Sequence, residues 1–378
     1  MKKFSNTRPW AGALSALGFL LALTALLAYP RLIKATMAGS IGYCLTVLVP
    51  TLFPYMALAC YAVNSSASAF LARPLGGLTR RLFRLPGCCA AAVLMSFVGG
   101  YPAGAKGVAI LLEQGNITRR QAGRMLLFCV NPGPAFVVAF LGAGVLGSMK
   151  LGWLLFLCVT LSGMLLGVIT ALGASEPDRA PAAAPAHPGG ALVRSVSDSA
   201  KSVVIMCACV VLFSGFTAIV QGCGLYGRLC VLLARTRLFT PFESAALLSF
   251  LLEVTGGVGE AAKVSAGPAF YAFGLAFGGL CVHLQVFSFF QEFPVERWKF
   301  FLARFVHGMM ASGCFLVLRR LLPAGSLPTG AAIPALGAKA FSGNIFGGAS
   351  LLVMCAAFLL IAQEKNLKVE AGRKKSGA

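Results

Sequence analysis

Charged residues are scarce in this sequence. Asp, Glu, Lys and Arg together make up 11% of the 378 residues, whereas a typical soluble domain has about 25%. Hydrophobic residues account for 58% of the chain, and the mean hydropathy is +0.83. This composition excludes an ordinary soluble globular protein and predicts an integral membrane protein.

Several functional signatures are missing as well. The 13 cysteines include no C-x-x-C pair, and the three histidines form no zinc-spaced set. The sequence contains no G-x-S-x-G, H-E-x-x-H, Rossmann or Walker A motif. We therefore expect no enzyme, no cofactor and no metal, and the absent Walker A motif argues against ATP-driven pumping by this chain itself.

Acidic residues are scarcer than basic ones. The chain has 11 Asp and Glu against 32 Lys and Arg, which gives a net charge of +21. No aromatic-interleaved basic domain is present, so nucleic acid is not an expected partner. The basic residues stand in short segments between apolar runs, as they do in cytoplasmic loops that meet anionic lipid. Membrane lipids are the partner that this charge predicts.

Ten apolar segments follow one another along the chain, and the 44 glycines and 19 prolines interrupt many of them. Such interruptions predict broken or closely packed helices. The first segment follows three basic residues and is interpreted as a spanning helix rather than a secretory signal, because further apolar segments follow it. The segments lie at about 10–29, 36–63, 88–112, 122–146, 151–173, 200–222, 243–262, 266–291, 300–318 and 345–362.

Two of these segments have a glycine-rich centre beside a charge. Segment 88–112 contains Gly99-Gly100-Tyr101-Pro102 and then Lys106, and segment 243–262 contains Glu253 and Gly256-Gly257. Each predicts two short helices that meet in a re-entrant hairpin. If the N-terminus is inside and each hairpin enters and leaves on one side, 21 basic residues lie inside and 10 outside, with Lys106 left in the membrane. This bias agrees with the positive-inside rule.

In this topology the two hairpins have opposite orientations. Each is followed by a predicted long helix, 122–146 in the first half and 266–291 in the second. The predicted fold is therefore an all-α polytopic membrane protein with two inverted repeats, an arrangement that builds alternating-access transporters.

The chain divides into four predicted parts. They are a membrane half at 1–173 with the first hairpin at 88–112, a flexible cytoplasmic linker at 174–199, a second half at 200–362 with its hairpin at 243–262, and a basic cytoplasmic tail at 363–378. The linker is assigned from its proline and alanine content. The arginine-rich stretch 69–85 is either a helix on the inner membrane surface or a solvated basic loop.

Candidate site residues are polar groups at membrane depth, where a charge costs about 3 kcal/mol or more. Lys106 either binds an anionic group near a helix N-terminus or only snorkels or pairs with a carboxylate. Glu253 either binds a proton, a cation or a substrate donor or only pairs with Lys106, and the neighbouring Thr255 is a candidate substrate-binding residue.

Two further polar groups interrupt the apolar helices. Asn131-Pro132-Gly133-Pro134 frees backbone carbonyls for a ligand or forms a packing kink. His283 and Gln285 lie on an otherwise apolar segment, where a lone histidine is more often hydrogen-bonded packing. The full predicted substrate-binding set is Gly100, Tyr101, Lys106, Asn131, Glu253, Thr255, His283 and Gln285.

These motifs resemble the YlbJ (SpoVV) family of sporulation integral membrane proteins, which carry the nucleoside-recognition Gate domain. The similar segments run in order over about 40–320, and the sequence departs from the family pattern at Asn131-Pro132, where a second polar residue is expected. The segments are Gly99-Gly-Tyr-Pro-Ala-Gly-Ala-Lys106, Asn131-Pro-Gly-Pro-Ala-Phe136, Gly142-Ala-Gly-Val-Leu-Gly147, Glu253-Val-Thr-Gly-Gly257 and Gly278-Gly-Leu-Cys-Val-His-Leu-Gln285.

The resemblance implies a protein of the outer forespore membrane in an endospore-forming bacterium, associated with passage of dipicolinic acid. It also implies a hairpin-bearing core similar to that of concentrative nucleoside transporters, an analogy of fold that does not fix a substrate. The leading hypothesis is a secondary carrier for a small organic anion, with dipicolinate as the candidate. The alternatives are a nucleoside or nucleobase transporter that uses Glu253, His283 and Gln285, and a non-transporting scaffold for spore assembly. The coupling ion, the direction of transport and assembly into a homo-oligomer stay open.

Overall fold

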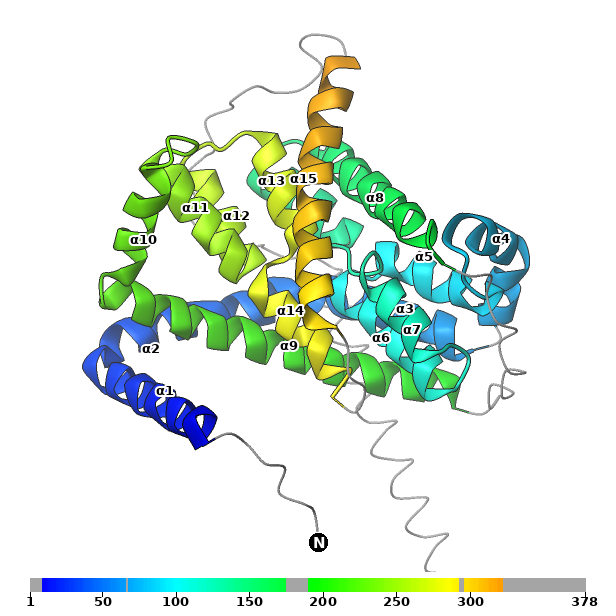
Figure 1. Ribbon diagram of the computed structural model, residues 1–378, viewed down its shortest axis with the longest axis horizontal. Helices are drawn as coiled ribbons and strands as arrows, with labels where there is room; N and C mark the ends of the chain where they lie inside the picture. The colour runs from blue at the N-terminus through cyan, green and yellow to red at the C-terminus, as the bar shows by residue number, and fades with distance from the viewer. Residues whose placement is uncertain (1–8, 66, 175–189, 292–295, 322–378) are drawn as a thin grey trace, which may run out of the picture.

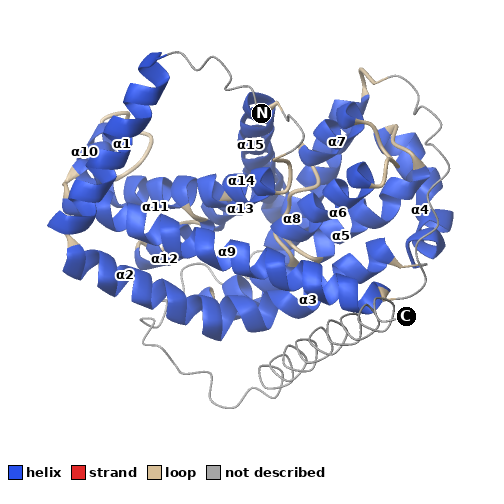
Figure 2. Ribbon diagram, turned by 90° about the horizontal axis from the view of Figure 1, so that it is seen from below, coloured by secondary structure: helices blue, strands red, loops and turns tan. Residues whose placement is uncertain are grey.

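The computed structural model describes residues 9–65, 67–174, 190–291 and 296–321 (Figure 1). These residues form helices and no strand (Figure 2), which confirms the all-α prediction. Five helical stretches are long and apolar enough to cross a membrane, or six if one bent pair counts as a span. The five are Pro30–Ala62, Met149–Ala171, Ala191–Gly222, Pro268–Ser288 and Arg297–Leu321.

The N-terminal part contains one long apolar unit. After α1 (Pro9–Ala28), the unit consists of α2 (Pro30–Tyr43), a π-helical turn η1 (Cys44–Leu48) and α3 (Val49–Asn64). The wide turn has a local cause, because Pro50 has no N–H to donate and the Val49 N–H bonds instead to Cys44 O, five residues back. α2 and α3 pack along α9 (Ala191–Gly222).

The arginine-rich stretch folds as helix α4 (Ala67–Phe83), so the alternative of a solvated loop is wrong. A sharp bend of 108° follows it. The chain then passes through the 3₁₀ turn η2 (Gly87–Cys89) into α5 (Ala90–Val98), and α6 (Tyr101–Glu113) folds back against α5. We call α5, α6 and the two glycines between them hairpin 1.

The helix predicted at 122–146 is interrupted at Asn131-Pro132-Gly133-Pro134, as that motif predicted, but the break is wider and the helical parts are shorter than expected. α7 (Arg119–Leu126) begins at a capping box made by Thr118 and Gln121 and ends after two turns. The chain is not helical over 127–133, and the π-helix η3 (Ala135–Val145) begins after its N-cap Pro134; we call residues 127–134 break 1. The prolines of break 1 cannot donate a backbone hydrogen bond, so a regular helix cannot continue through it. α8 (Met149–Ala171) then packs against η3.

The second half starts earlier than predicted. α9 begins at Ala191, so the end of the predicted linker at 174–199 is helical, while 175–189 lie outside the described residues. The sequence analysis did not mark α10 (Leu225–Ala234). α11 (Pro241–Leu252) and α12 (Val254–Lys263) pack together on either side of Glu253, and we call this unit hairpin 2.

The helix predicted at 266–291 corresponds to one candidate span, Pro268–Ser288, but it is not continuous. It consists of α13 (Pro268–Phe277) and α14 (Gly279–Ser288), which are separated at Gly278. Gly278 and Gly279 have φ values of 83° and 77°, a left-handed conformation that L side chains rarely adopt. We call this pair break 2. α15 (Arg297–Leu321) follows and packs against α13 and α8, and the segment at 345–362 and the tail at 363–378 lie outside the described residues.

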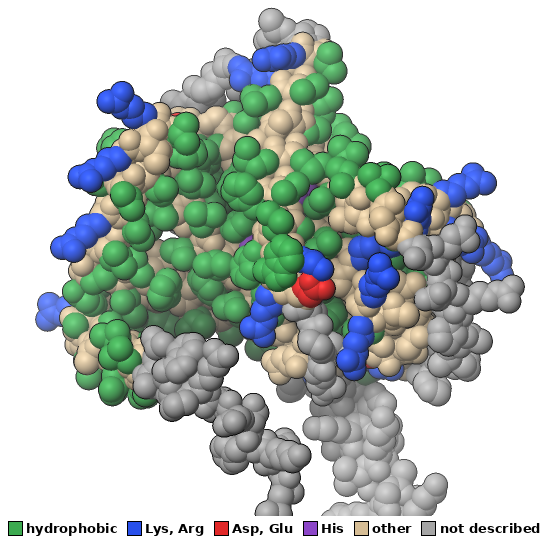
Figure 3. Space-filling model, in the orientation of Figure 1, with side chains coloured by type: hydrophobic (Ala, Val, Ile, Leu, Met, Phe, Trp, Pro, Cys, Tyr) green, Lys and Arg blue, Asp and Glu red, His purple; other side chains and the backbone are tan. Residues whose placement is uncertain are grey.

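The surface agrees with a membrane environment. In Figure 3, hydrophobic side chains cover the centre of the visible face, and most Lys and Arg side chains lie toward its edges. Large apolar side chains are exposed on the long helices, such as Leu212 of α9 at 64% and Val317 of α15 at 58%. Exposed apolar surface of this extent is unfavourable in water and suits contact with lipid.

Candidate functional site

The tip of hairpin 1 packs directly on break 1. Gly100 has a φ of 84°, and a Cβ there would lie 3.4 Å from the backbone nitrogen of Gly133. A Cβ on Gly133 would in turn lie 3.0 Å from Val98 O and 3.1 Å from Gly100 N. The backbones touch because neither residue has a side chain, so the glycines set the distance between the hairpin tip and the broken helix.

The tip of hairpin 2 is organised by one carboxylate. Glu253 is the N-cap of α12, and its carboxylate accepts hydrogen bonds from Thr255 N at 2.8 Å and Gly256 N at 2.7 Å. It also accepts a short hydrogen bond from the Thr255 hydroxyl. These donors satisfy the free N–H groups at the start of α12, and the negative charge lies at the positive end of the helix dipole.

Hairpin 2 packs on break 2, as hairpin 1 does on break 1. A Cβ on Gly279 would lie 2.8 Å from Phe250 O and 3.1 Å from Glu253 N. Any side chain at Gly279 would therefore push the hairpin tip away. Each hairpin tip thus rests on the interruption of a helix that follows it in sequence.

The two tips meet around one small inner cavity. Five of the eight predicted site residues line it. Its volume is about 40 Å³, and because about 10–15 Å³ measured in this way holds one water, the cavity has room for only a few waters. A substrate-sized organic solute does not fit in a space of this volume. We call this conformation, in which both tips rest on their breaks, the closed conformation. The five residues are Gly100, Tyr101, Glu253, Thr255 and Gln285.

A larger polar vestibule of about 390 Å³ lies beside the inner cavity, between α2, α9 and hairpin 2. Hydroxyl and amide side chains line it, among them Ser40, Thr217 and Gln221. Glu253 and Thr255 line both the vestibule and the inner cavity. The tip of hairpin 2 therefore stands between the two spaces.

Lys106 and Asn131 lie away from the cavity lining. The Lys106 ammonium stands 5.9 Å from the centre of the Phe289 ring, a cation–π contact. The buried Asn131 donates to Phe128 O at 2.7 Å within break 1, and its Oδ1 has no partner among the described residues. Direct substrate contact by these two residues stays a prediction, since neither of them lines the cavity in this conformation.

His283 also lies away from the cavity lining and is packed. Its Nε2 lies 2.9 Å from Phe277 O, and its ring contacts those of Phe277, Phe300 and Phe301. This environment is the hydrogen-bonded packing that the sequence analysis kept as the alternative.

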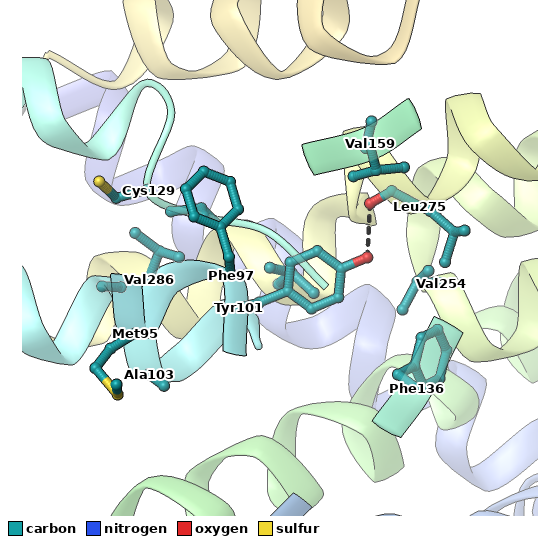
Figure 4. Close-up of a cluster of buried hydrophobic side chains, with 14 of the residues drawn as sticks. Met95, Phe97, Tyr101, Ala103, Cys129, Phe136, Val159, Val254, Leu275 and Val286 are labelled. Atoms are coloured by element: carbon teal, nitrogen blue, oxygen red, sulfur yellow. Dashed lines mark hydrogen bonds between the residues drawn. The ribbon is translucent and has the colours of Figure 1, made fainter. Parts of the chain in front are cut away.

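Three side chains satisfy the free carbonyls at the end of α13. Tyr101 donates its hydroxyl to Leu275 O at 2.6 Å, as Figure 4 shows. Arg304 of α15 donates to Ala276 O, and His283 meets Phe277 O. Helix carbonyls left without partners at a break need such donors. Tyr101 therefore has a structural role in addition to lining the cavity.

Arg304 is the polar residue that the sequence analysis missed. It was counted among the basic residues at the inner membrane side, yet its side chain is fully buried. Its place inside the apolar segment 300–318 was the available signal, because an arginine at membrane depth is a candidate site residue by default.

Lys106 and Glu253 do not form an ion pair. The described residues contain two ion pairs, Lys263–Glu260 and Lys299–Glu296. We therefore expect the double variant Lys106→Met with Glu253→Gln to lose the sum of the two single losses in unfolding free energy, within about 0.5 kcal/mol. Thermal unfolding of the purified variants measures this, and recovery of stability in the double variant would show that the two charges are paired after all.

The described residues therefore define an all-helical integral membrane protein with two helical hairpins whose tips meet at a cavity. The chain is similar to the sporulation integral membrane protein YlbJ of Bacillus subtilis (strain 168), with 25% identity over 352 residues that cover 83% of this chain and 86% of that protein. This similarity confirms the resemblance to the YlbJ family. No protein-family model matches the chain. No solved structure matches it.

Proposed function

We propose that this protein is a secondary membrane carrier for a small organic anion and not an enzyme. The observation that carries the proposal is the inner cavity between two hairpin tips, each seated on a broken helix. Broken helices meeting near the centre of a membrane protein are the usual substrate site of such carriers. The polar vestibule lies beside that site and shares Glu253 and Thr255 with it, which suits a path for the substrate from one side.

The resemblance to sporulation proteins supports dipicolinate as the substrate and the outer forespore membrane as the location. Dipicolinate is a planar dicarboxylate, and it is much larger than the closed cavity. Transport then requires at least one hairpin tip to move away from its break. The contact between Gly100 and Gly133 suits such a movement of hairpin 1, because neither residue has a side chain that must separate there. Hairpin 2 is held more firmly, since the Phe250 ring of α11 packs against Phe270 and Tyr271 of α13.

The two hairpins belong, in this proposal, to inverted repeats of the kind that concentrative nucleoside transporters have. The equivalent packing of each tip on a break supports the relation. Hairpin 1 then opens to the cytoplasm and hairpin 2 to the opposite side. Single cysteines at the exposed positions Gln114 and Lys263, in a cysteine-free background, should react from opposite faces of the membrane, and reaction from one face would rule out the inversion.

A nucleoside or nucleobase is the second candidate substrate. Glu253, Thr255 and Gln285 line the inner cavity, and neither it nor the vestibule is lined by Lys or Arg. Carboxylate, hydroxyl and amide groups form hydrogen bonds to neutral sugars and bases without requiring a charge on the ligand. This lining is the specific observation that favours the alternative.

Uptake by proteoliposomes separates the hypotheses. Purified protein is reconstituted and offered labelled dipicolinate or labelled uridine, and protein-free liposomes are the control. We expect saturable uptake of dipicolinate that excess unlabelled dipicolinate abolishes and uridine does not. Saturable uptake of uridine alone would support the nucleoside carrier, and uptake of neither compound would leave the scaffold hypothesis.

A further inference from the structure

A buried arginine outside the cavity lining has unused hydrogen-bond donors. Arg304 is 0% exposed. Its Nη2 donates to Ala276 O, but its Nε and Nη1 have no hydrogen-bond partner among the described residues. A guanidinium stays protonated in proteins, so Arg304 is a permanent positive charge.

No carboxylate neutralises this charge in the described part of the chain. The two ion pairs found there both lie elsewhere, at Lys263–Glu260 and Lys299–Glu296. Leaving a buried charge without an opposite charge is strongly unfavourable, and buried donors without acceptors add to the cost. The negative end of the α13 dipole offsets part of it. The remaining donors are suited to an anionic acceptor that arrives from outside.

Tyr101 connects Arg304 to the cavity. The Tyr101 side chain lines the cavity, and its hydroxyl donates to Leu275 O. The next carbonyl along α13, that of Ala276, accepts from Arg304. Figure 4 shows the phenol hydroxyl of Tyr101 meeting the carbonyl oxygen of Leu275.

We infer that Arg304 binds a carboxylate of the transported anion, and that Tyr101 screens it from the cavity in this closed conformation. The inference rests on the proposed function and names the cation that the cavity lining itself lacks. Release of Tyr101 from Leu275 O exposes the guanidinium, whose free donors then bind carboxylate oxygens. Charge-assisted hydrogen bonds of this kind are among the strongest in proteins.

The experiment measures ligand selectivity rather than activity alone. Calorimetric binding of dipicolinate and of its uncharged diamide is compared for wild type, Arg304→Met, Arg304→Lys and Arg319→Met. Arg319 is exposed on the same helix, so its loss changes the charge of α15 without touching the cavity. We expect Arg304→Met to lower the preference for dipicolinate over the diamide by about 100-fold, Arg304→Lys by about 10-fold, and Arg319→Met not at all.

Two results overturn the inference. The first is an unchanged preference for dipicolinate over the diamide in folded Arg304→Met. The second is an equal fall in affinity for both ligands, which is expected of a residue that only stabilises α13. If Arg304→Met does not insert, Arg304→Lys decides the matter by the same preference. Failure of the wild type to take up dipicolinate would instead contradict the proposed function, and the inference would then fall because it rests on that function.

Discussion

Gly104→Ala should prevent hairpin 1 from folding. A Cβ at Gly104 would overlap Cys129 O and lie 2.9 Å from the Cα of Ser96. These obstacles are backbone atoms on both sides, so no side-chain rotation relieves them, and α5, α6 and break 1 must move apart. We expect a loss of about 3 kcal/mol or more in unfolding free energy, with little folded protein in detergent extracts.

Gly123→Ala is the matched control for this prediction. Gly123 lies inside α7, and a Cβ there would meet nothing within 4 Å. Because alanine favours a helix over glycine by about 1 kcal/mol, this variant should be as stable as wild type or slightly more stable. Thermal unfolding followed by size-exclusion chromatography measures both variants. Equal stability of Gly104→Ala and Gly123→Ala would show that the hairpin and break 1 are not in contact.

Glu253→Ala should reduce transport by more than about 100-fold while the protein still folds. The variant loses the N-cap of α12, which costs about 1–2 kcal/mol. Under the proposed function it also removes the charged group that lines both the vestibule and the inner cavity. The loss in transport should therefore greatly exceed what a small loss of stability explains. Initial uptake rates per folded protein in proteoliposomes measure the effect.

Glu243→Ala distinguishes the effect of losing a helix cap from the effect of losing a charge in the cavity lining. Glu243 belongs to the capping box at the start of α11, where it accepts from Thr240 N at 2.8 Å and from the Thr240 hydroxyl at 2.9 Å. It lies on the same hairpin but lines neither space. Its removal should cost a similar amount of stability and leave transport near the wild-type rate. If both variants lose transport equally, Glu253 is only a helix cap.

The sequence located the two hairpins well because their causes are local. Gly99-Gly100 and the following Pro102 interrupt a helix wherever they occur, and Glu253 ahead of Thr255 and Gly256 caps a new one. These effects depend on backbone freedom and on hydrogen bonds that span two or three residues. The same local reasoning selected five residues that do line one cavity.

Other features could not be predicted because they depend on distant partners. The 266–291 segment is apolar enough for one helix, and it breaks at Gly278 where donors from elsewhere satisfy the freed carbonyls. One donor, Tyr101, lies 174 residues earlier in the chain, and another, Arg304, lies 28 residues beyond its acceptor. No local sequence pattern predicts hydrogen bonds between residues so far apart in the chain. The same limit explains why Lys106 and Glu253 were plausible partners in sequence but are not paired in space.

Composition and local helix chemistry thus determined that this is an all-helical membrane protein with two hairpins, because hydropathy, glycine and proline act over a few residues. The tertiary structure decided which polar groups share the cavity, that Arg304 is buried behind it and that α13 ends where it does. Those outcomes depend on which donor reaches which freed carbonyl, and that is settled only when segments far apart in the chain pack together.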